Sequence, residues 1–234
     1  THLSGYTSYI VPIITSESTT ENNNNVIAVH LDAREFEGWW YEGGGIYRHV
    51  WLVHAPSVHV QQWGVYVSPS VSLPSSNVHI ETTIINEGQQ QSVITISQTI
   101  LDAQGWYVTC VNTTVTIDGK SQLITAHEAI IPQVHLWSPD DPYLYTLITS
   151  VISGVGVDTV ETEFGVRTVS FDVNHGLIFN GKPVKIKGVC NHQDFAGVGV
   201  AMPDRLNEWR VRKMKQLGAN AWRNSHNAVN PELL

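Results

Sequence analysis

The sequence has little of the basic character that binding to nucleic acids or anionic membranes requires. It carries 13 Lys and Arg against 21 Asp and Glu, a formal net charge of −8 over 234 residues. The basic residues form no cluster, and the run Lys213-Met214-Lys215 is typical of the solvated face of a helix. No apolar run approaches the roughly 20 residues that a membrane-spanning helix needs. We therefore expect neither nucleic acid nor a membrane as a partner.

Cysteine is scarce, and the histidines lack the spacing of metal sites. The two cysteines, Cys110 and Cys190, fall in different predicted domains, so we expect no disulfide between them. The 11 histidines show no His-x-His or His-Glu-x-x-His pattern. The sequence therefore predicts no metal ligand and no cofactor within this chain.

Apolar residues are plentiful, and most of them alternate with polar ones. With 42% hydrophobic and 15% charged residues, the chain can bury a sizeable core. Alternation with a period of two, as in Val78–Ile84 and Ile94–Ile100, predicts a two-sheet sandwich of about seven strands over residues 57–167. Residues 1–56 contain three shorter β-like runs, Tyr9–Ile14, Val26–Leu31 and Ile46–Val53.

The pattern changes in the last quarter of the chain, where two strands alternate with helical spacing. Asp204 is a candidate N-cap, and Gly218 is a helix stop. The helix is expected to carry its apolar side chains Leu206, Trp209, Met214 and Leu217 on one stripe. The predicted elements are a hairpin turn at Asn180–Pro183, a strand over Val184–Cys190, a helix over Arg205–Leu217 and a strand over Ala219–Arg223. Polar loops follow both strands, as at the opening of a parallel α/β barrel, where chemistry sits at the carboxyl ends of the strands.

Several blocks of sequence resemble glycoside hydrolase family 2, the β-galactosidase and β-glucuronidase group, in the order that family has them. The string HQDFAGVGVAMPDR in the barrel opening is most similar to the β-galactosidases of the family. The other blocks are GYTSYIVPI (Gly5–Ile13), GWWYEGGGIYRHVWL (Gly38–Leu52), LWSPDDPYLYTL (Leu136–Leu147) and FGVR (Phe164–Arg167).

The resemblance implies a mainly β chain of three segments. Residues 1–56 would be the C-terminal part of a jelly-roll sugar-binding domain, whose first strands precede Thr1. Residues 57–167 would form an immunoglobulin-like sandwich that serves as a scaffold. Residues 168–234 would begin a TIM (β/α)8 barrel, of which 234 − 170 = 64 residues follow Ser170, where such a barrel takes about 250.

The resemblance also implies substrate-binding residues at the two strand ends. His192 and Asp194 match family positions that contact the sugar in the −1 subsite, and Arg223, Asn224 and His226 lie in a stretch that resembles the family's R-x-S-H pattern. The alternatives are a polar loop that caps the barrel, for His192 and Asp194, and a structural arginine between strands, for Arg223.

A second set of candidates lies in the predicted jelly roll. Trp39 can stack on a pyranose ring, and Glu37 can reach a sugar hydroxyl. Packing at a domain interface is the alternative for Trp39.

The barrel segment lacks the pair of carboxylates that glycoside hydrolysis requires. Retaining glycosidases hold two carboxyl groups about 5–5.5 Å apart across the scissile bond. Only Asp194 follows a predicted strand; Glu208 lies on the helix, and Glu232 in the first turn of the next helix. In the family, the acid/base, the nucleophile and any metal ligands lie on later strands, beyond Leu234, so we predict no catalytic residue here.

We therefore interpret the chain as a fragment of a retaining exo-β-glycosidase that hydrolyses terminal β-linked sugars. The fragment alone is expected to be inactive. The expected partner is a β-galactoside or a related carbohydrate, and the resemblance leaves a homo-oligomer open. The alternative function is a non-catalytic carbohydrate-binding or adhesion module built from the β domains.

Overall fold

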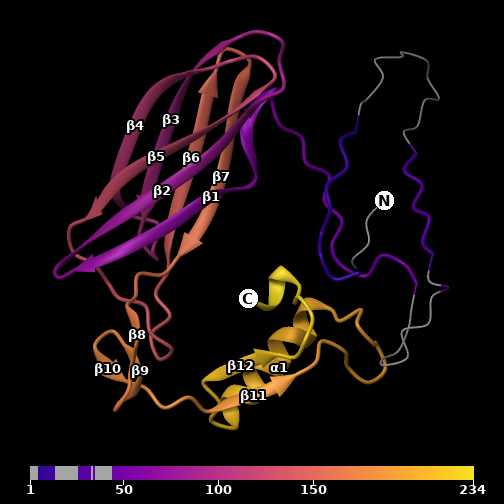
Figure 1. The fold of residues 1–234 in the computed structure, drawn as a ribbon, viewed down its shortest axis with the longest axis vertical. Coiled ribbons are helices and arrows are strands. Elements are labelled where there is room, and N and C mark those ends of the chain that lie inside the picture. Colours follow the sequence, from indigo (N-terminus) through magenta and orange to yellow (C-terminus); the bar gives the residue numbers. More distant parts are fainter. Residues whose placement is uncertain (1–4, 14–25, 33, 35–43) are drawn as a thin grey trace. The chain divides into compact units, whose positions relative to one another are not determined.

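The structure, a computed structural model, describes residues 5–13, 26–32, 34 and 44–234 (Figure 1). The chain divides into two compact units, Leu52–Lys185 and a second unit made of Thr1–Trp51 with Ile186–Leu234. In the described residues, no helix is long and apolar enough to cross a membrane.

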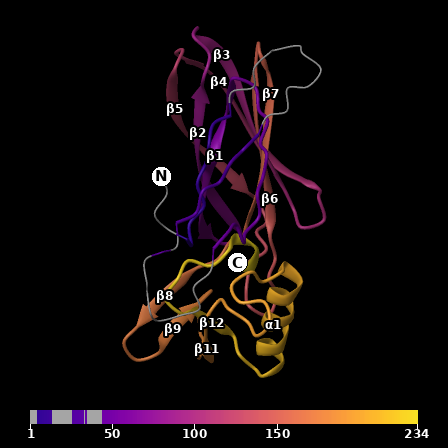
Figure 2. The ribbon, with the colours of Figure 1, turned by 90° about the vertical axis from the view of Figure 1, so that its right-hand side faces the viewer.

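The first unit is built on two antiparallel sheets, with strand orders β1-β2-β5 and β4-β3-β6-β7 (Figures 1 and 2). This arrangement confirms the predicted two-sheet sandwich of seven strands. The strands are β1 (Val58–Ser72), β2 (Ser75–Asn86), β3 (Ser92–Leu101), β4 (Tyr107–Ile117), β5 (Ser121–Ile131), β6 (Tyr145–Ser153) and β7 (Gly156–Phe164).

The alternating sequence pattern gives the sandwich its core. Along β2, every second residue from Val78 to Ile84 is buried, and the same holds from Ile94 to Ile100 on β3. Full burial of one such aliphatic side chain contributes about 1.5–3 kcal/mol relative to exposure. The apolar cores join residues of both sheets, for example Ile80 of β2 with Leu147 of β6.

Three polar side chains cross this core and satisfy one another. The side-chain amide of Gln98 donates from Nε2 to Thr82 Oγ1 at 2.9 Å, and His127 Nδ1–H donates to Gln98 Oε1 at 2.7 Å. Gln98 and Thr82 are fully buried. Burial lowers the pKa of His127, because desolvation disfavours the imidazolium form.

A small sheet of order β10-β9-β8 follows the sandwich, from β8 (Val169–Asp172), β9 (Gly176–Phe179) and β10 (Lys182–Pro183). The predicted turn joins β9 to β10, with Asn180 and Gly181 both in the left-handed region at φ 48° and 74°, the conformation of a type I′ hairpin. This sheet lies in the compact unit Leu52–Lys185. The sequence-based prediction assigns residues 168–185 to the barrel segment instead. The domain boundaries themselves stay predictions.

The strand–helix–strand unit predicted for the C-terminal quarter is present. Strand β11 (Gly188–Asn191) pairs in parallel with β12 (Ala221–Asn224), and helix α1 (Asp204–Gln216) connects them. A short 3-10 helix, η1 (Pro231–Leu233), follows. Gly218 at φ 87° lies just past the helix, as a C-terminal stop does.

Two details of the predicted helix are wrong. Pro203 is the N-cap, with no side-chain capping bond, and Asp204 is the first helical residue. The Asp204 carboxylate contacts His49 Nε2 at 3.0 Å. The predicted apolar stripe is not the buried face: Trp209 and Leu217 are 47% and 77% exposed, whereas Asn207 and Arg210 are buried.

In their described residues, the β-like runs predicted before residue 57 form no strand. In the described parts of Tyr9–Ile14, Val26–Leu31 and Ile46–Val53 the chain has no strand assignment, and Ile10, Val26 and Leu52 are largely exposed. A strand needs a neighbour that exchanges backbone hydrogen bonds with it, and these runs have no such ladder among the residues the structure describes.

Candidate functional site

The carboxyl ends of β11 and β12 lie side by side. In the parallel register Asn191 pairs with Asn224, the last residue of each strand, and Ser225 N–H donates to the Asn191 carbonyl at 3.0 Å. The loops that follow the two strands therefore leave the sheet at the same edge. In parallel α/β folds this edge carries the ligand-binding residues.

Two of the predicted sugar-contacting residues meet at this edge. The rings of His192 and His226 have their centroids 5.4 Å apart in an edge-to-face arrangement, with His192 half-buried and His226 exposed. His226 has φ 76°, in the left-handed region that a bulky side chain rarely adopts. Such local strain concentrates at functional sites, where the surrounding structure maintains it.

Arg223 and Asn224 make contacts within their own loop. The Arg223 guanidinium donates to Ser225 Oγ at 3.3 Å, and Ser225 itself is buried. Asn224 Nδ2 donates to the Asn227 carbonyl and so closes the loop that carries His226. The structure thus brings four predicted residues to one edge of the sheet, and two of them shape the loop that bears a third.

Asp194, the fifth predicted residue, lies close enough to a buried arginine to influence it. Arg210 of α1 is 7% exposed and lies over the Trp222 and Phe195 rings, with its Cζ 5.2 and 5.8 Å from their centroids. Burial lowers the pKa of Arg210, and the nearby Asp194 carboxylate acts in the opposite direction. Arg210 Nη2 donates to the His192 carbonyl at 2.7 Å, so this buried side chain supports the start of the loop after β11.

Arg210 was not among the predicted site residues, although the sequence contains a signal for it. Arg210 stands four residues after Leu206 and four before Met214, on the stripe predicted to be apolar. A charged residue at the centre of such a stripe is buried only with partners. Its position therefore pointed to a role inside the barrel opening.

Arg48 was also missed, and it links the segment before the sandwich to both strand-end loops. Its Nη2 donates to Gln193 Oε1 at 2.9 Å and to the Ala228 carbonyl at 2.6 Å. Its Nη1 donates to the Tyr6 carbonyl at 2.5 Å. No sequence pattern relates residues so far apart in the chain.

Two amide groups beside the histidines are buried without a partner. Asn191 Nδ2 and Gln193 Nε2 make no hydrogen bond within the described part of the chain. An unpaired buried donor costs about 1–3 kcal/mol. Both donors are therefore available to a group that the described residues do not supply.

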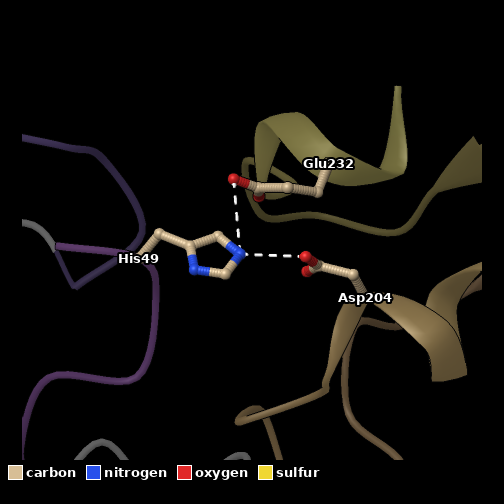
Figure 3. A group of neighbouring side chains, drawn as sticks. All are labelled: His49, Asp204 and Glu232. Carbon is tan, nitrogen blue, oxygen red and sulfur yellow. Dashed lines mark hydrogen bonds and ion pairs between the residues drawn. The ribbon is translucent and has the colours of Figure 1, made fainter. Parts of the chain in front are cut away.

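A separate cluster contains groups that can hold a metal ion. His49, Asp204 and Glu232 place one ligand atom each within 4.8 Å of one another (Figure 3). The pKa of His49 is raised, chiefly because Asp204 accepts a hydrogen bond from the ring and also attracts its positive charge. The three residues are distant in sequence, so no spacing motif predicts them as ligands. The remaining candidates, Trp39 and Glu37, lie outside the described residues.

Comparison with known proteins identifies the kind of protein to which this arrangement belongs. The model of "Glycosyl hydrolases family 2" matches residues 58–167, and the model of "Glycosyl hydrolases family 2, TIM barrel domain" matches residues 171–234. The sandwich and the parallel strand–helix–strand unit are thus two domain types of one family, and the second is a barrel opening. The chain belongs to glycoside hydrolase family 2.

Relatives of several organisms match most of the chain. It is 36% identical over 213 residues to the beta-galactosidase BoGH2A of Bacteroides ovatus, covering 90% of this chain and 25% of that protein. It is 32% identical over 215 residues to a putative beta-glucuronidase of Formosa agariphila, covering 88% of this chain and 20% of the relative. A beta-galactosidase of Thermoanaerobacter pseudethanolicus is 32% identical over 240 residues, with 96% and 31% covered. The chain therefore spans about a quarter of the length of these relatives.

Solved structures agree with the sequence comparison. A family 2 glycosyl hydrolase of Bacteroides cellulosilyticus superposes with a TM-score of 0.80 at 30% identity, covering 86% of this chain and 28% of that one. Beta-glucuronidase 2 of Bacteroides uniformis, covalently bound to cyclophellitol-6-carboxylate aziridine, gives a TM-score of 0.76 at 28% identity, with 81% and 24% covered.

Proposed function

We propose that this chain is part of a retaining exo-β-glycosidase that hydrolyses terminal β-linked sugars, most like a β-galactosidase. The observation that carries the proposal is the meeting of His192 and His226, 5.4 Å apart, at the carboxyl ends of two parallel strands. Family membership supplies the reaction class. The same family implies a carbohydrate as the substrate.

The strand-end residues suit a sugar-binding subsite. Sugar hydroxyls both donate and accept hydrogen bonds, and imidazole and carboxylate groups provide both kinds of partner. Asp194 and Asn224 would add an acceptor and an amide to the two histidines. The unpaired amides of Asn191 and Gln193 support the proposal, because a hydroxyl or a further part of the protein would satisfy them.

Arg223 would orient carboxylates at the base of the pocket through paired hydrogen bonds. The catalytic acid/base and nucleophile would be carboxylates on later barrel strands. Asp194 is the only carboxylate in the two strand-end loops, residues 192–194 and 225–229, whereas the reaction needs a pair. The covalent adduct of the Bacteroides uniformis relative supports a nucleophile in the complete protein. The chain alone would therefore bind without hydrolysing.

The galactoside is proposed over the glucuronide on the strength of similarity. Identity reaches 36% with a β-galactosidase and 32% with a putative β-glucuronidase, both over more than 200 residues. We also propose that residues 1–56 complete a jelly-roll sugar-binding domain in the whole protein. In that domain Trp39 and Glu37 would approach the sugar.

The test is a comparison of two polypeptides on two substrates. We would assay the 234-residue chain and a polypeptide extended through the remaining barrel strands, with 4-nitrophenyl β-galactoside and 4-nitrophenyl β-glucuronide. We expect no turnover by the short chain and turnover of the galactoside by the extended one. Preference for the glucuronide would overturn the substrate assignment. Sugar binding without hydrolysis by the extended polypeptide would favour the non-catalytic binding module.

A further inference from the structure

Three side chains from separate segments converge on one point of the second unit. His49 comes from the stretch before the sandwich, Asp204 is the first residue of α1, and Glu232 lies in η1 (Figure 3). His49 Nε2 lies 3.0 Å from Asp204 Oδ2 and 3.8 Å from Glu232 Oε1. All three ligand atoms lie within 4.8 Å of one another.

The geometry of the His49 cluster differs from that of a histidine that merely lies between two carboxylates. This chain contains a histidine of that second kind, His79. On the outer face of the sandwich, His79 offers Nδ1 to Glu128 at 2.5 Å and Nε2 to Glu81 at 3.2 Å. Its two carboxylates therefore contact opposite sides of the ring, and one ion cannot bind to both and to the ring. In the other cluster, both carboxylates face the same nitrogen of His49.

A divalent transition-metal ion fits three such atoms. Zinc binds imidazole nitrogen and carboxylate oxygen at about 2.0–2.2 Å, which sets two ligands of a tetrahedral ion about 3.4 Å apart. The separations of 3.0 and 3.8 Å bracket that value. One imidazole with two carboxylates is a nitrogen and oxygen donor set that zinc and manganese accept.

Solvent access and charge also agree with a bound cation. The side chains of His49, Asp204 and Glu232 are 45%, 50% and 27% exposed, so water can complete the coordination. When the His49 imidazole is neutral, the negative charges of Asp204 and Glu232 lie close together without a positive charge between them. A divalent ion would neutralise both.

We propose that His49, Asp204 and Glu232 form a binding site for a divalent transition-metal ion such as Zn²⁺. The ion joins the stretch around His49 to α1 and η1, which are more than 150 residues further along the chain. Its role is structural: it fixes the segment that carries Arg48 against the loops after β11 and β12.

The experiment is a calorimetric titration of the metal-stripped 234-residue chain with Zn²⁺. We compare the wild type with His49→Gln, Asp204→Asn and Glu232→Gln. His79→Gln is the matched control, because it removes a histidine that also touches two carboxylates. Loss of a partner that merely orients a metal ligand costs about 10–100-fold in affinity, so loss of a ligand is expected to cost at least as much.

The expected result is one Zn²⁺ per chain, with affinity reduced at least tenfold in each cluster variant and unchanged in the control. Equal affinities in all variants would mean adventitious binding to surface histidines and would overturn the proposal, as would no binding. Far-ultraviolet circular dichroism of every variant separates loss of the site from loss of the fold. Cobalt substitution gives a second measurement, since the visible absorption of a protein-bound ion should disappear in His49→Gln.

Discussion

Arg210 is a buried charged residue whose guanidinium lies among two aromatic rings, the Met202 sulfur and the His192 carbonyl. Its guanidinium donates to the His192 carbonyl at 2.7 Å and contacts the faces of Trp222 and Phe195. The side chain is 7% exposed, so solvent screens these interactions little. Through the bond to the His192 carbonyl, Arg210 contacts the loop that presents His192 and Asp194.

Replacement of Arg210 by alanine is expected to loosen that loop. The His192 carbonyl would lose its donor, at a cost of about 1–3 kcal/mol, and the rings would lose their cation contact. Hydrogen exchange should become faster in residues 188–195, with little change in the sandwich. The neighbouring Arg212→Ala is the control, because Arg212 pairs with Glu208 on the exposed face. Equal protection in Arg210→Ala and the wild type would contradict this role.

Gln98 is a buried polar residue of the sandwich core. Both the nitrogen and the oxygen of its side-chain amide are hydrogen-bonded. Leucine at this position has a similar size but leaves Thr82 Oγ1 and His127 Nδ1–H without a partner. We expect Gln98→Leu to reduce the free energy of unfolding by about 1–3 kcal/mol. Urea denaturation measures it, with Thr95→Ala on the outer face of the same strand as the control. A variant as stable as the wild type would show that the apolar surroundings offset the lost bonds.

At the scale of elements, the sequence predicted those strands and turns that depend only on residues close together in the chain. The alternation in β2 and β3 and the Asn180-Gly181 turn needed no knowledge of the remaining chain. The helix was correct in extent, but its buried face was not, because the partners of Arg210 come from other segments. The runs around Ile10 and Val26 have strand-like composition yet no ladder, since composition cannot supply a neighbouring strand.

On the outer face of the β1-β2-β5 sheet, His79 is expected to make stability depend on pH. Its pKa is raised, first because of the hydrogen bond to Glu128 and then that to Glu81. Because the pKa of His79 is higher in the folded state, its contacts stabilise the fold at pH values below the unfolded-state pKa of about 6.5. This stabilisation is lost as the pH rises through the folded-state pKa. We expect His79→Gln to lose more stability, relative to the wild type, at pH 5.5 than at pH 8.5.

For His127→Gln we expect the opposite pH dependence of the change in stability. Burial lowers the pKa of His127, so protonation below the unfolded pKa favours unfolding, and its replacement should relieve an acid-dependent loss. Thermal denaturation of both variants across this pH range distinguishes the two effects. The same pH trend in both variants would contradict the account.

At the scale of the whole molecule, the candidate site could be located from sequence but not assembled. The resemblance and the position of polar residues after two strands were enough to predict His192, Asp194, Arg223, Asn224 and His226 as site residues. Neither could reveal the contact between the histidines, the support from Arg48 and Arg210, or the cluster around His49. Those features depend on residues brought together by folding from distant parts of the chain.

The most direct test of the central claim is the effect of His226 on catalysis in the polypeptide extended through the barrel. Asparagine at this position tolerates the left-handed backbone at φ 76° but lacks the imidazole. We predict that His226→Asn lowers kcat/KM for 4-nitrophenyl β-galactoside about a hundredfold, or roughly 2.7 kcal/mol. The control His175→Asn, in the turn between β8 and β9, should keep the wild-type value. Equal kcat/KM for His226→Asn and the wild type would contradict the claim that His226 contacts the sugar.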